Sequence, residues 1–176
     1  NISKKNTGSL DLFLNIFEIF TIIRVVLGDE FFVDIVPLFE SVSDLENSSD
    51  IMQKVYANKL YRQHLKNRNN VQTIMLGFSD GTKDGGYLTA NWSILKAKES
   101  LTKVSRKFGI KVIFFDGRGG PPARGGGNTH QFYSSLGDFI ESDQIQLTVQ
   151  GQTISSNFGT IESSQYNLSL IHISEP

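Results

Sequence analysis

Four short runs of apolar residues, each followed by a polar or glycine-containing turn, predict β-strands at 33–39, 72–78, 111–115 and 145–150. Three of these runs are almost continuously apolar. Such runs are typical of strands that are covered on both faces, as in a parallel sheet. The segments between them have helical spacing, so the pattern predicts an α/β fold in which strands and helices alternate.

The first apolar segment, residues 10–27, predicts a mostly buried helix. Asp11, Asn15, Glu18 and Arg24 interrupt it, whereas a helix that crosses a bilayer needs about 20 predominantly apolar residues. We therefore expect no membrane span in this segment, and its acidic residues also argue against a signal peptide.

Further helices are predicted between the strands. Ser49 is a suitable N-cap for a helix that precedes the second strand. Between the second and third strands, apolar residues recur at steps of three and four with one gap, and Gly109 stands where this helix would end. These residues are Leu88, Trp92, Leu95, Leu101, Val104 and Phe108. A shorter helix is expected at 129–136.

This order gives about four βα units, which is half of an eight-stranded (β/α) barrel of roughly 250 residues. A partial, helix-rich TIM-type barrel is the favoured fold, and a small doubly wound sheet is the alternative. In both folds, ligands bind at the carboxyl ends of the strands. Polar residues gather at those ends: Glu40 after the first strand, Ser79, Asp80, Lys83 and Asp84 after the second, Asp116 and Arg118 after the third, and Gln150 after the fourth.

Composition and charge narrow the possible functions. Hydrophobic residues make up 39% of the chain and charged residues 20%, which is ordinary for one globular domain. A formal net charge of −1 argues against a dedicated nucleic-acid binder. The absence of cysteine excludes disulfides and thiolate metal sites, and it fits a reducing compartment such as the cytoplasm.

The carboxylates of Glu40 and Asp80 end two successive strands and could hold a hard divalent cation such as Mg²⁺ through oxygen. The alternative is that both are ordinary polar residues at strand ends. Lys83 lies in "GFSDGTKDGG", which resembles a phosphate cradle but lacks the Walker pattern. A solvated turn explains this spacing equally well.

The stretch "FFDGRGGPPARGGGNTH", residues 114–130, allows three interpretations: a mobile linker, an RNA-binding Arg-Gly-Gly segment, or a rigid anion-binding loop. RNA-binding segments of this kind belong to extended low-complexity sequence, whereas this one is enclosed by a strand and a helix. The guanidinium groups of Arg118 and Arg124 suit phosphate or carboxylate, and the glycines let backbone N–H groups approach an anion. We favour the anion-binding loop.

These residues lie in four blocks through which the chain resembles the phosphoenolpyruvate carboxylase family: "VDIVPLFESVSDL", "TIMLGFSDGTKDGGYLTANWSILKAKESL", "FFDGRGGPPARGGGNTH" and "IQLTVQGQTISSNFG". The likeness covers about residues 30–167. It implies a barrel of the phosphoenolpyruvate-utilising kind. It also implies a reaction dependent on Mg²⁺ or Mn²⁺, in which phosphoenolpyruvate and bicarbonate give oxaloacetate and phosphate and so replenish the tricarboxylic acid cycle.

Carried over by motif, the resemblance implies that Glu40 and Asp80 are metal ligands and that Lys83 handles bicarbonate. Arg118 resembles the arginine that grips the substrate phosphate. Arg124 resembles the second arginine of that loop, implicated in carboxylation and in binding the inhibitors aspartate or malate. The full-length family member is commonly a homotetramer, with no nucleic-acid or membrane partner. A noncatalytic phosphate- or dicarboxylate-binding module on the same fold is the alternative.

Several positions depart from the family pattern: Phe78 where many members have Tyr, Gly81 where they have Ser, and Asp116 where they have His. In addition, "PPA" at 121–123 replaces a more usual linker that contains Ser or Thr. The Asp116 carboxylate is expected to offset part of the charge of Arg118. We assign residues 1–168 to one barrel domain and expect 169–176 to be a tail foreign to the family.

The chain begins at Asn1 without a methionine, and we expect it to be a fragment. The family's catalytic histidine and further arginines lie outside this region. The chain alone is therefore expected to be inactive. As half a barrel with open sheet edges, it is also expected to be marginally stable or prone to aggregate.

Overall fold

The structure is a computed structural model that describes residues 7–28, 33–77, 79–117, 129–148 and 151–173. Within them, four strands form one sheet in the order β1-β2-β3-β4, and each neighbouring pair is parallel. The strands are β1 (Leu38–Phe39), β2 (Val71–Leu76), β3 (Lys111–Asp116) and β4 (Ile145–Leu147). The predicted parallel α/β sheet is confirmed.

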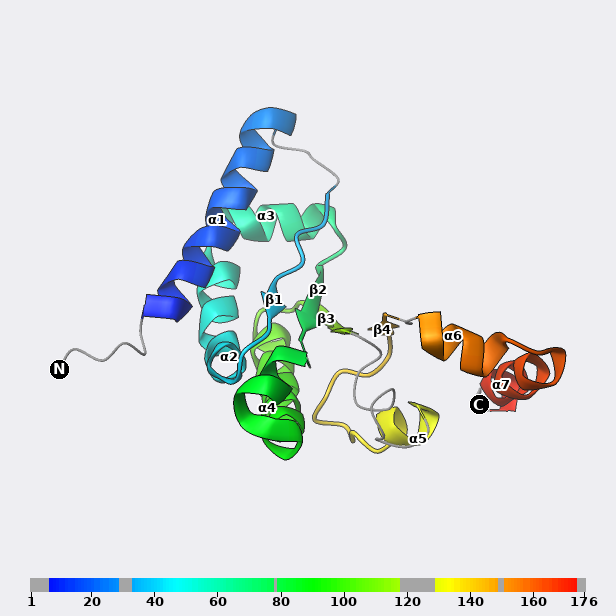
Figure 1. Cartoon of the computed structure of the whole chain (residues 1–176). Helices are drawn as coiled ribbons and strands as arrows, with labels where there is room; N and C mark the ends of the chain where they lie inside the picture. The colour runs from blue at the N-terminus through cyan, green and yellow to red at the C-terminus, as the bar shows by residue number, and fades with distance from the viewer. Residues whose placement is uncertain (1–6, 29–32, 78, 118–128, 149–150, 174–176) are drawn as a thin grey trace.

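The helices of the described residues are α1 (Thr7–Leu27), α2 (Val42–Ala57), α3 (Lys59–Asn67), α4 (Ser79–Lys107), α5 (Thr129–Ser134), α6 (Gly151–Phe158) and α7 (Ile161–Ile173). Figure 1 shows α1 to α4 gathered around β1 to β3, while α6 and α7 lie beyond β4. α2 packs against both α1 and α4, and α6 packs against α7. The structure is therefore helix-rich, as predicted.

One face of β2 is more fully buried than the other. In β2 the buried positions are Gln72, Ile74 and Leu76, and the residues between them are only half-buried. Ile74 and Leu76 belong to one hydrophobic core with Phe39 of β1 and Phe114 of β3. This core supplies the burial of apolar surface that stabilises the fold.

A capping box starts α2. The Ser41 hydroxyl accepts a hydrogen bond from the Asp44 backbone N–H at 3.1 Å, and the Ser41 N–H donates to the Asp44 carboxylate at 3.2 Å. The prediction that Ser49 caps this helix is wrong, because Ser41 satisfies the first free N–H groups two turns earlier. Asn58 then ends α2 and caps α3, where its side-chain oxygen accepts from the Leu60 N–H at 2.9 Å.

Helix α1 is less buried than predicted. Ile16 and Phe20 pack into the core, but Ile22, Val25 and Val26 are 62%, 80% and 73% exposed. The reason is that α1 packs against α2 and, through Phe20, against α3, and its exposed apolar residues lie outside these contacts in the described structure. None of the described helices is both long and apolar enough to cross a membrane.

The predicted crossover helix between β2 and β3 is confirmed as α4, with two differences. It begins at Ser79, and Gly86 interrupts it with φ 79° and ψ 169°, so a short helical segment precedes the long one. Leu88 and Trp92 are 81% and 58% exposed and lie outside the buried face. Gly109 follows the helix with φ +67°, as expected for a residue that ends a helix.

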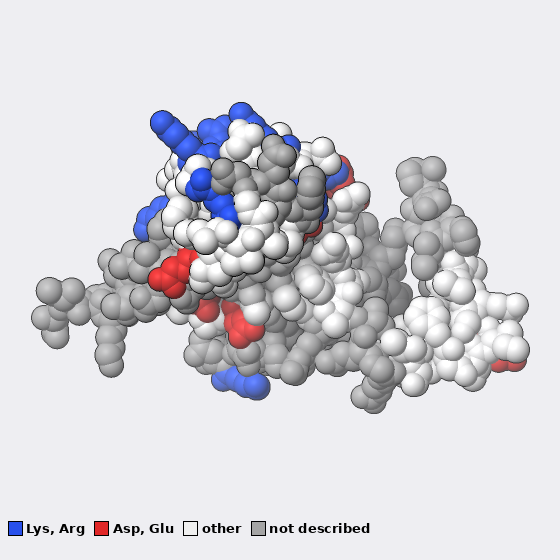
Figure 2. All heavy atoms as spheres, turned by 90° about the horizontal axis from the view of Figure 1, so that it is seen from above, with Lys and Arg blue, Asp and Glu red and all other residues white. Residues whose placement is uncertain are grey.

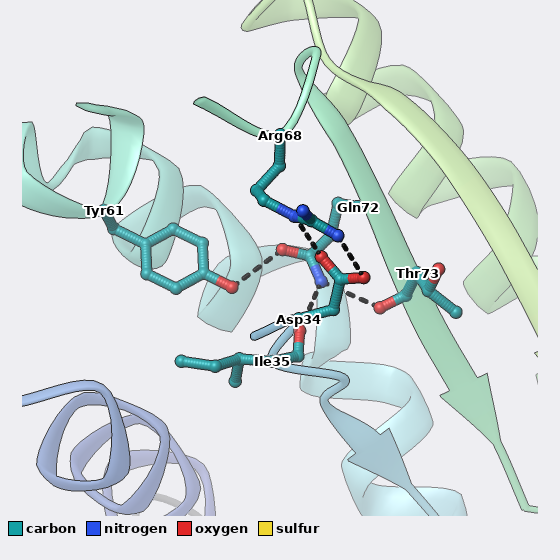
Figure 3. Close-up of polar contacts among 6 residues, drawn as sticks. All are labelled: Asp34, Ile35, Tyr61, Arg68, Gln72 and Thr73. Carbon is teal, nitrogen blue, oxygen red and sulfur yellow. Dashed lines mark hydrogen bonds and ion pairs between the residues drawn. The ribbon is translucent and has the colours of Figure 1, made fainter. Parts of the chain in front are cut away.

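A polar network fixes the chain just before β1 (Figure 3). The Arg68 guanidinium donates two hydrogen bonds to the Asp34 carboxylate, at 2.7 and 2.8 Å. The Tyr61 hydroxyl donates to the Gln72 side-chain oxygen at 2.8 Å, and the Gln72 amide donates to two backbone carbonyls, including that of Ile35. The hydrogen bond from Arg68 is the main reason why the pKa of Asp34 lies below its usual value.

Candidate active site

The carboxyl ends of the strands meet at one edge of the sheet. Phe39 pairs with Leu76, Leu76 with Asp116, and Asp116 with Leu147. Because these residues end their strands in register, the segments that follow them start side by side. The edge is therefore the place where the predicted polar residues can act together.

Glu40 lies directly against the end of β2. The Gly77 N–H donates to the Phe39 carbonyl at 2.8 Å. A Cβ atom built on Gly77 would lie 3.0 Å from both Cα and Cγ of Glu40, which is tighter than nine in ten real Cβ contacts, so Glu40 would have to move by a few tenths of an ångström. Gly77 therefore permits the close approach of the two strand ends, and the Glu40 side chain remains exposed at the edge.

Asp80 and Lys83 lie in the short helical segment that opens α4. The alternative of a solvated turn for this stretch is wrong, because residues 79–85 are helical and Gly86 alone breaks the helix. Lys83 is exposed, and the Asp80 side chain lies outside the described side chains. The segment follows Gly77 by two residues, which brings it to the same edge as Glu40.

The donor chemistry of Glu40 and Asp80 suits a hard divalent cation. Carboxylate oxygens are the ligands that Mg²⁺ takes from proteins, usually one or two of them together with water and substrate oxygen. Among the described side chains there is no cluster of three or more His, Asp or Glu that could hold a metal alone. Two carboxylates that follow neighbouring strands suit a cation that takes its remaining ligands from water and from the bound substrate.

Arg118 and Arg124 lie outside the described residues, as does Phe78. The described chain ends at Gly117 and resumes at Thr129 in α5. A Cβ atom on Gly117 would lie 3.3 Å from the Leu76 carbonyl oxygen, so this glycine also packs tightly against the end of β2. The arginine segment therefore starts from the same edge as Glu40.

Asp116 is buried and paired. Its Oδ2 atom lies 2.7 Å from the Lys98 ammonium nitrogen, and the same oxygen accepts a hydrogen bond of 2.5 Å from the Tyr133 hydroxyl. Burial, followed by the negative charge of Asp116, raises the pKa of Tyr133 far above its ordinary value, so the hydroxyl remains a donor. Lys98 already pairs with this carboxylate. The expected offset of Arg118 by Asp116 stays a prediction, because Arg118 lies outside the described residues.

Lys98 and Tyr133 were not among the predicted site residues. The sequence nevertheless contains a signal for Lys98, because it lies on the buried face of α4 with Ile94 and Leu101, which are four residues before it and three after it. A charged residue on an apolar helix face requires a buried partner. Tyr133 had no comparable signal, since tyrosine is common at both buried and exposed positions.

The exposed basic residues lie mostly elsewhere. Figure 2 shows Lys and Arg side chains gathered on one part of the visible face. Exposed basic residues are frequent in α3 and in the last turns of α4: Lys59, Arg62, Lys66, Lys103, Arg106 and Lys107. These helix ends lead into the amino ends of β2 and β3, and so lie away from the candidate site. A pocket of about 310 Å³ near Asp34 and Gln72 is at that amino edge too, with these polar groups engaged in the network of Figure 3.

Comparison with known proteins gives two findings. The family model described as phosphoenolpyruvate carboxylase matches residues 23–174. The curated phosphoenolpyruvate carboxylase of Azoarcus sp. (strain BH72) is 40% identical over 139 residues, which cover 79% of this chain and 15% of the relative. The family match and helix α7 both continue past residue 168, so the boundary placed there stays a prediction.

Proposed function

Because the chain belongs to the phosphoenolpyruvate carboxylase family, we propose that it supplies part of an active site in which phosphoenolpyruvate and bicarbonate give oxaloacetate and phosphate. The observation that carries the proposal is the register of β1, β2 and β3. It brings Glu40, the helical segment with Asp80 and Lys83, and the start of the arginine segment to one edge of the sheet.

The proposed fold is part of a (β/α) barrel. The strands keep their sequence order β1-β2-β3-β4, whereas a doubly wound sheet reverses its strand order at a switch point. The face of β2 that points away from the core is half-buried. Such a face is expected of a barrel interior that further strands would close.

In the proposed site, Glu40 and Asp80 would hold Mg²⁺ or Mn²⁺. A divalent cation supplies Lewis-acid stabilisation of negative charge that develops on substrate oxygen. The protein's own part would be to bring the two carboxylates together, and the close approach of the ends of β1 and β2 at Gly77 supports this role.

The remaining charges of the edge would bind and orient the substrates. A bicarbonate oxygen attacks phosphorus, and the bond between phosphorus and the enol oxygen breaks, which leaves carboxyphosphate and the enolate of pyruvate. Carboxyphosphate then releases phosphate and CO₂, and the enolate carbon attacks CO₂. Arg118 would bind the transferring phosphoryl group and Lys83 the bicarbonate, since fixed cations stabilise both charged intermediates. Arg124 would assist carboxylation.

Several properties of the whole protein belong to this proposal. They are a homotetramer, inhibition by aspartate or malate near Arg124, and action in the cytoplasm. The chain spans 15% of the length of the curated relative. The isolated chain is therefore expected to be inactive, because the family's catalytic histidine and other arginines would come from further segments.

The test uses the full reading frame that contains this chain. Oxaloacetate formation from phosphoenolpyruvate should require both bicarbonate and Mg²⁺, and Arg118→Ala should raise the KM for phosphoenolpyruvate. Asp80→Asn should lower turnover about 100-fold or more, since one electrostatic contact in a transition state contributes that much. Asp50→Asn, an exposed position on α2, is the matched control and should have no effect.

Two outcomes would overturn the proposal. A folded protein that binds phosphoenolpyruvate without turning it over would be a noncatalytic phosphate- or dicarboxylate-binding module. Turnover that does not respond to bicarbonate would indicate another reaction on the same fold.

A further inference from the structure

Three buried side chains meet at the end of β3. Lys98 from α4 and Asp116 from β3 are each 2% exposed, and Tyr133 from α5 is 8% exposed. The Asp116 Oδ2 atom accepts from the Lys98 ammonium at 2.7 Å and from the Tyr133 hydroxyl at 2.5 Å. One carboxylate oxygen therefore joins a strand to two separate helices.

The tyrosine holds the lysine as well as the carboxylate. The Lys98 nitrogen lies 5.3 Å from the centre of the Tyr133 ring and 5.6 Å from that of Phe114. Both distances allow a cation–π interaction. Each of the three residues thus contacts the other two, and the positive charge is enclosed by a carboxylate and two rings.

Fold stability alone does not explain such a cluster. Taking two charges out of water is costly, and apolar residues of similar volume often stabilise a protein equally well or better. The advantage of the buried pair is directional, because hydrogen bonds define how the joined elements lie relative to one another.

The position of the cluster along the chain indicates what it orients. Asp116 is the last residue of β3, and Tyr133 lies in α5, the next described element. The segment between them carries Arg118 and Arg124. We infer that Lys98, Asp116 and Tyr133 form a clamp that fixes both ends of this arginine segment and so positions it for binding the substrate phosphate.

The function of the clamp in substrate binding rests on the proposed function, and its effect on the segment does not. Tyr133→Phe removes one hydroxyl but keeps the ring beside Lys98, so the fold should be retained. In the full reading frame, we expect the KM for phosphoenolpyruvate to rise about tenfold or more, because small misplacements of binding groups have large effects. The activation constant for Mg²⁺ should stay unchanged, and the unfolding temperature should fall, because a buried hydrogen bond to a charged group is lost. Tyr166→Phe, at a 65% exposed position, is the matched control.

A second variant avoids the buried unpaired charge that a single substitution would leave. Lys98→Met combined with Asp116→Leu removes both charges, and the protein should remain folded. Its stability should fall somewhat, because leucine is larger than aspartate and the Tyr133 hydroxyl loses its acceptor. It should show the same rise in KM as Tyr133→Phe. An unchanged KM in a folded double variant would refute the clamp as a positioning device.

Hydrogen exchange tests the clamp independently of the proposed function. The backbone amides of residues 117–128, apart from Pro121 and Pro122, should exchange faster in both variants, and those of β2 should not change. If exchange accelerates but the parent protein has no carboxylase activity, the clamp stands and the proposed function fails. If exchange in that segment is unchanged, the clamp is refuted whatever the activity.

Discussion

At the scale of single residues, the most informative position is a glycine. Gly77 carries no charge, yet it decides how closely Glu40 can approach the end of β2. A site built from neighbouring strand ends depends on such contacts as much as on the residues that bind the ligand. The same edge contains Gly117, whose added Cβ would meet the Leu76 carbonyl at a less severe 3.3 Å.

In the full reading frame, Gly77→Ala is expected to reduce kcat/KM for phosphoenolpyruvate by between about 10-fold and 100-fold. The reason is that the new methyl group forces the Glu40 backbone or side chain to move. The overcrowding should also lower the free energy of unfolding by about 1–3 kcal/mol. Steady-state kinetics at several Mg²⁺ concentrations would measure the first effect. Gly117→Ala should be milder in both respects, and equal effects of the two variants would contradict this explanation.

The burial of His64 predicts how the stability of the fold depends on pH. The imidazole is 5% exposed and lies beside the rings of Phe20 and Tyr61, and this burial is the main cause that lowers its pKa. The unfolded chain therefore takes up the proton more readily than the folded one. The contribution of His64 to the free energy of unfolding is fully present above about pH 6.5, and it is lost as the pH falls through the lower pKa of the folded state.

The pH dependence can be tested by thermal unfolding between pH 7 and about pH 5, the range in which a histidine with a lowered pKa titrates. His64→Phe keeps an aromatic ring at this position and should remove the part of the slope that comes from His64. Gln63→His, which adds an exposed imidazole at the neighbouring position, should leave the slope as it was. A slope that survives His64→Phe would assign the pH dependence to other groups.

At the scale of elements, the capping box of α2 determines where the helix begins and hence how β1 leads into it. Ser41→Ala removes the hydroxyl that accepts from the Asp44 N–H. The free energy of unfolding should fall by about 1 kcal/mol, as is usual when an N-cap is lost. Chemical denaturation would show this, and Ser49→Ala, inside the same helix, should change much less. Equal losses would mean that the cap has no special role.

Much of this element pattern could be predicted from the sequence, because residues that are buried at regular intervals along a helix or strand give a regular spacing of apolar residues. The four strands, the crossover helix and the stop at Gly109 all follow from apolar spacing and from one backbone requirement. The start of α2 was missed although the sequence contains a local signal for it. Ser41 has an acidic residue, Asp44, three positions later, which is the pattern of a capping box, whereas Ser49 has Met52 there.

Less of the candidate site than of the element pattern could be predicted from the sequence. Strand ends could be located, and Glu40 was placed at the edge where parallel strands converge. The partners of Asp116 could not be found in the same way, because Lys98 and Tyr133 are distant in sequence and meet it only in the folded chain. Tertiary contacts of this kind have no local signature.

At the scale of the whole molecule, the described structure exposes apolar surface on α1 and leaves both edges of its sheet unpaired. Val25 and Val26 on α1 are 80% and 73% exposed. β1 and β4 form the two edges of the sheet, and unpaired sheet edges promote association. The isolated chain should therefore associate at micromolar concentration, as light scattering would reveal.

Replacing Val25 by Glu and Val26 by Lys should increase the monomeric fraction of the isolated chain, with a change in unfolding free energy within about 0.5 kcal/mol, as for other surface sites. In the full reading frame the same double variant should lower the unfolding temperature, because we expect other segments to cover this face. Unchanged stability there would show that α1 is exposed in the whole protein as well.

The measurement that tests the central claim most directly follows oxygen from bicarbonate in the full reading frame. With bicarbonate labelled with ¹⁸O at all its oxygens, the proposed chemistry transfers one labelled oxygen to phosphate and the other two to the new carboxylate of oxaloacetate. Mass spectrometry of both products, before the label exchanges with water, should find this distribution. Phosphate without label would mean that water attacks phosphorus, and it would contradict carboxylation at the edge formed by Glu40, Asp80 and Lys83.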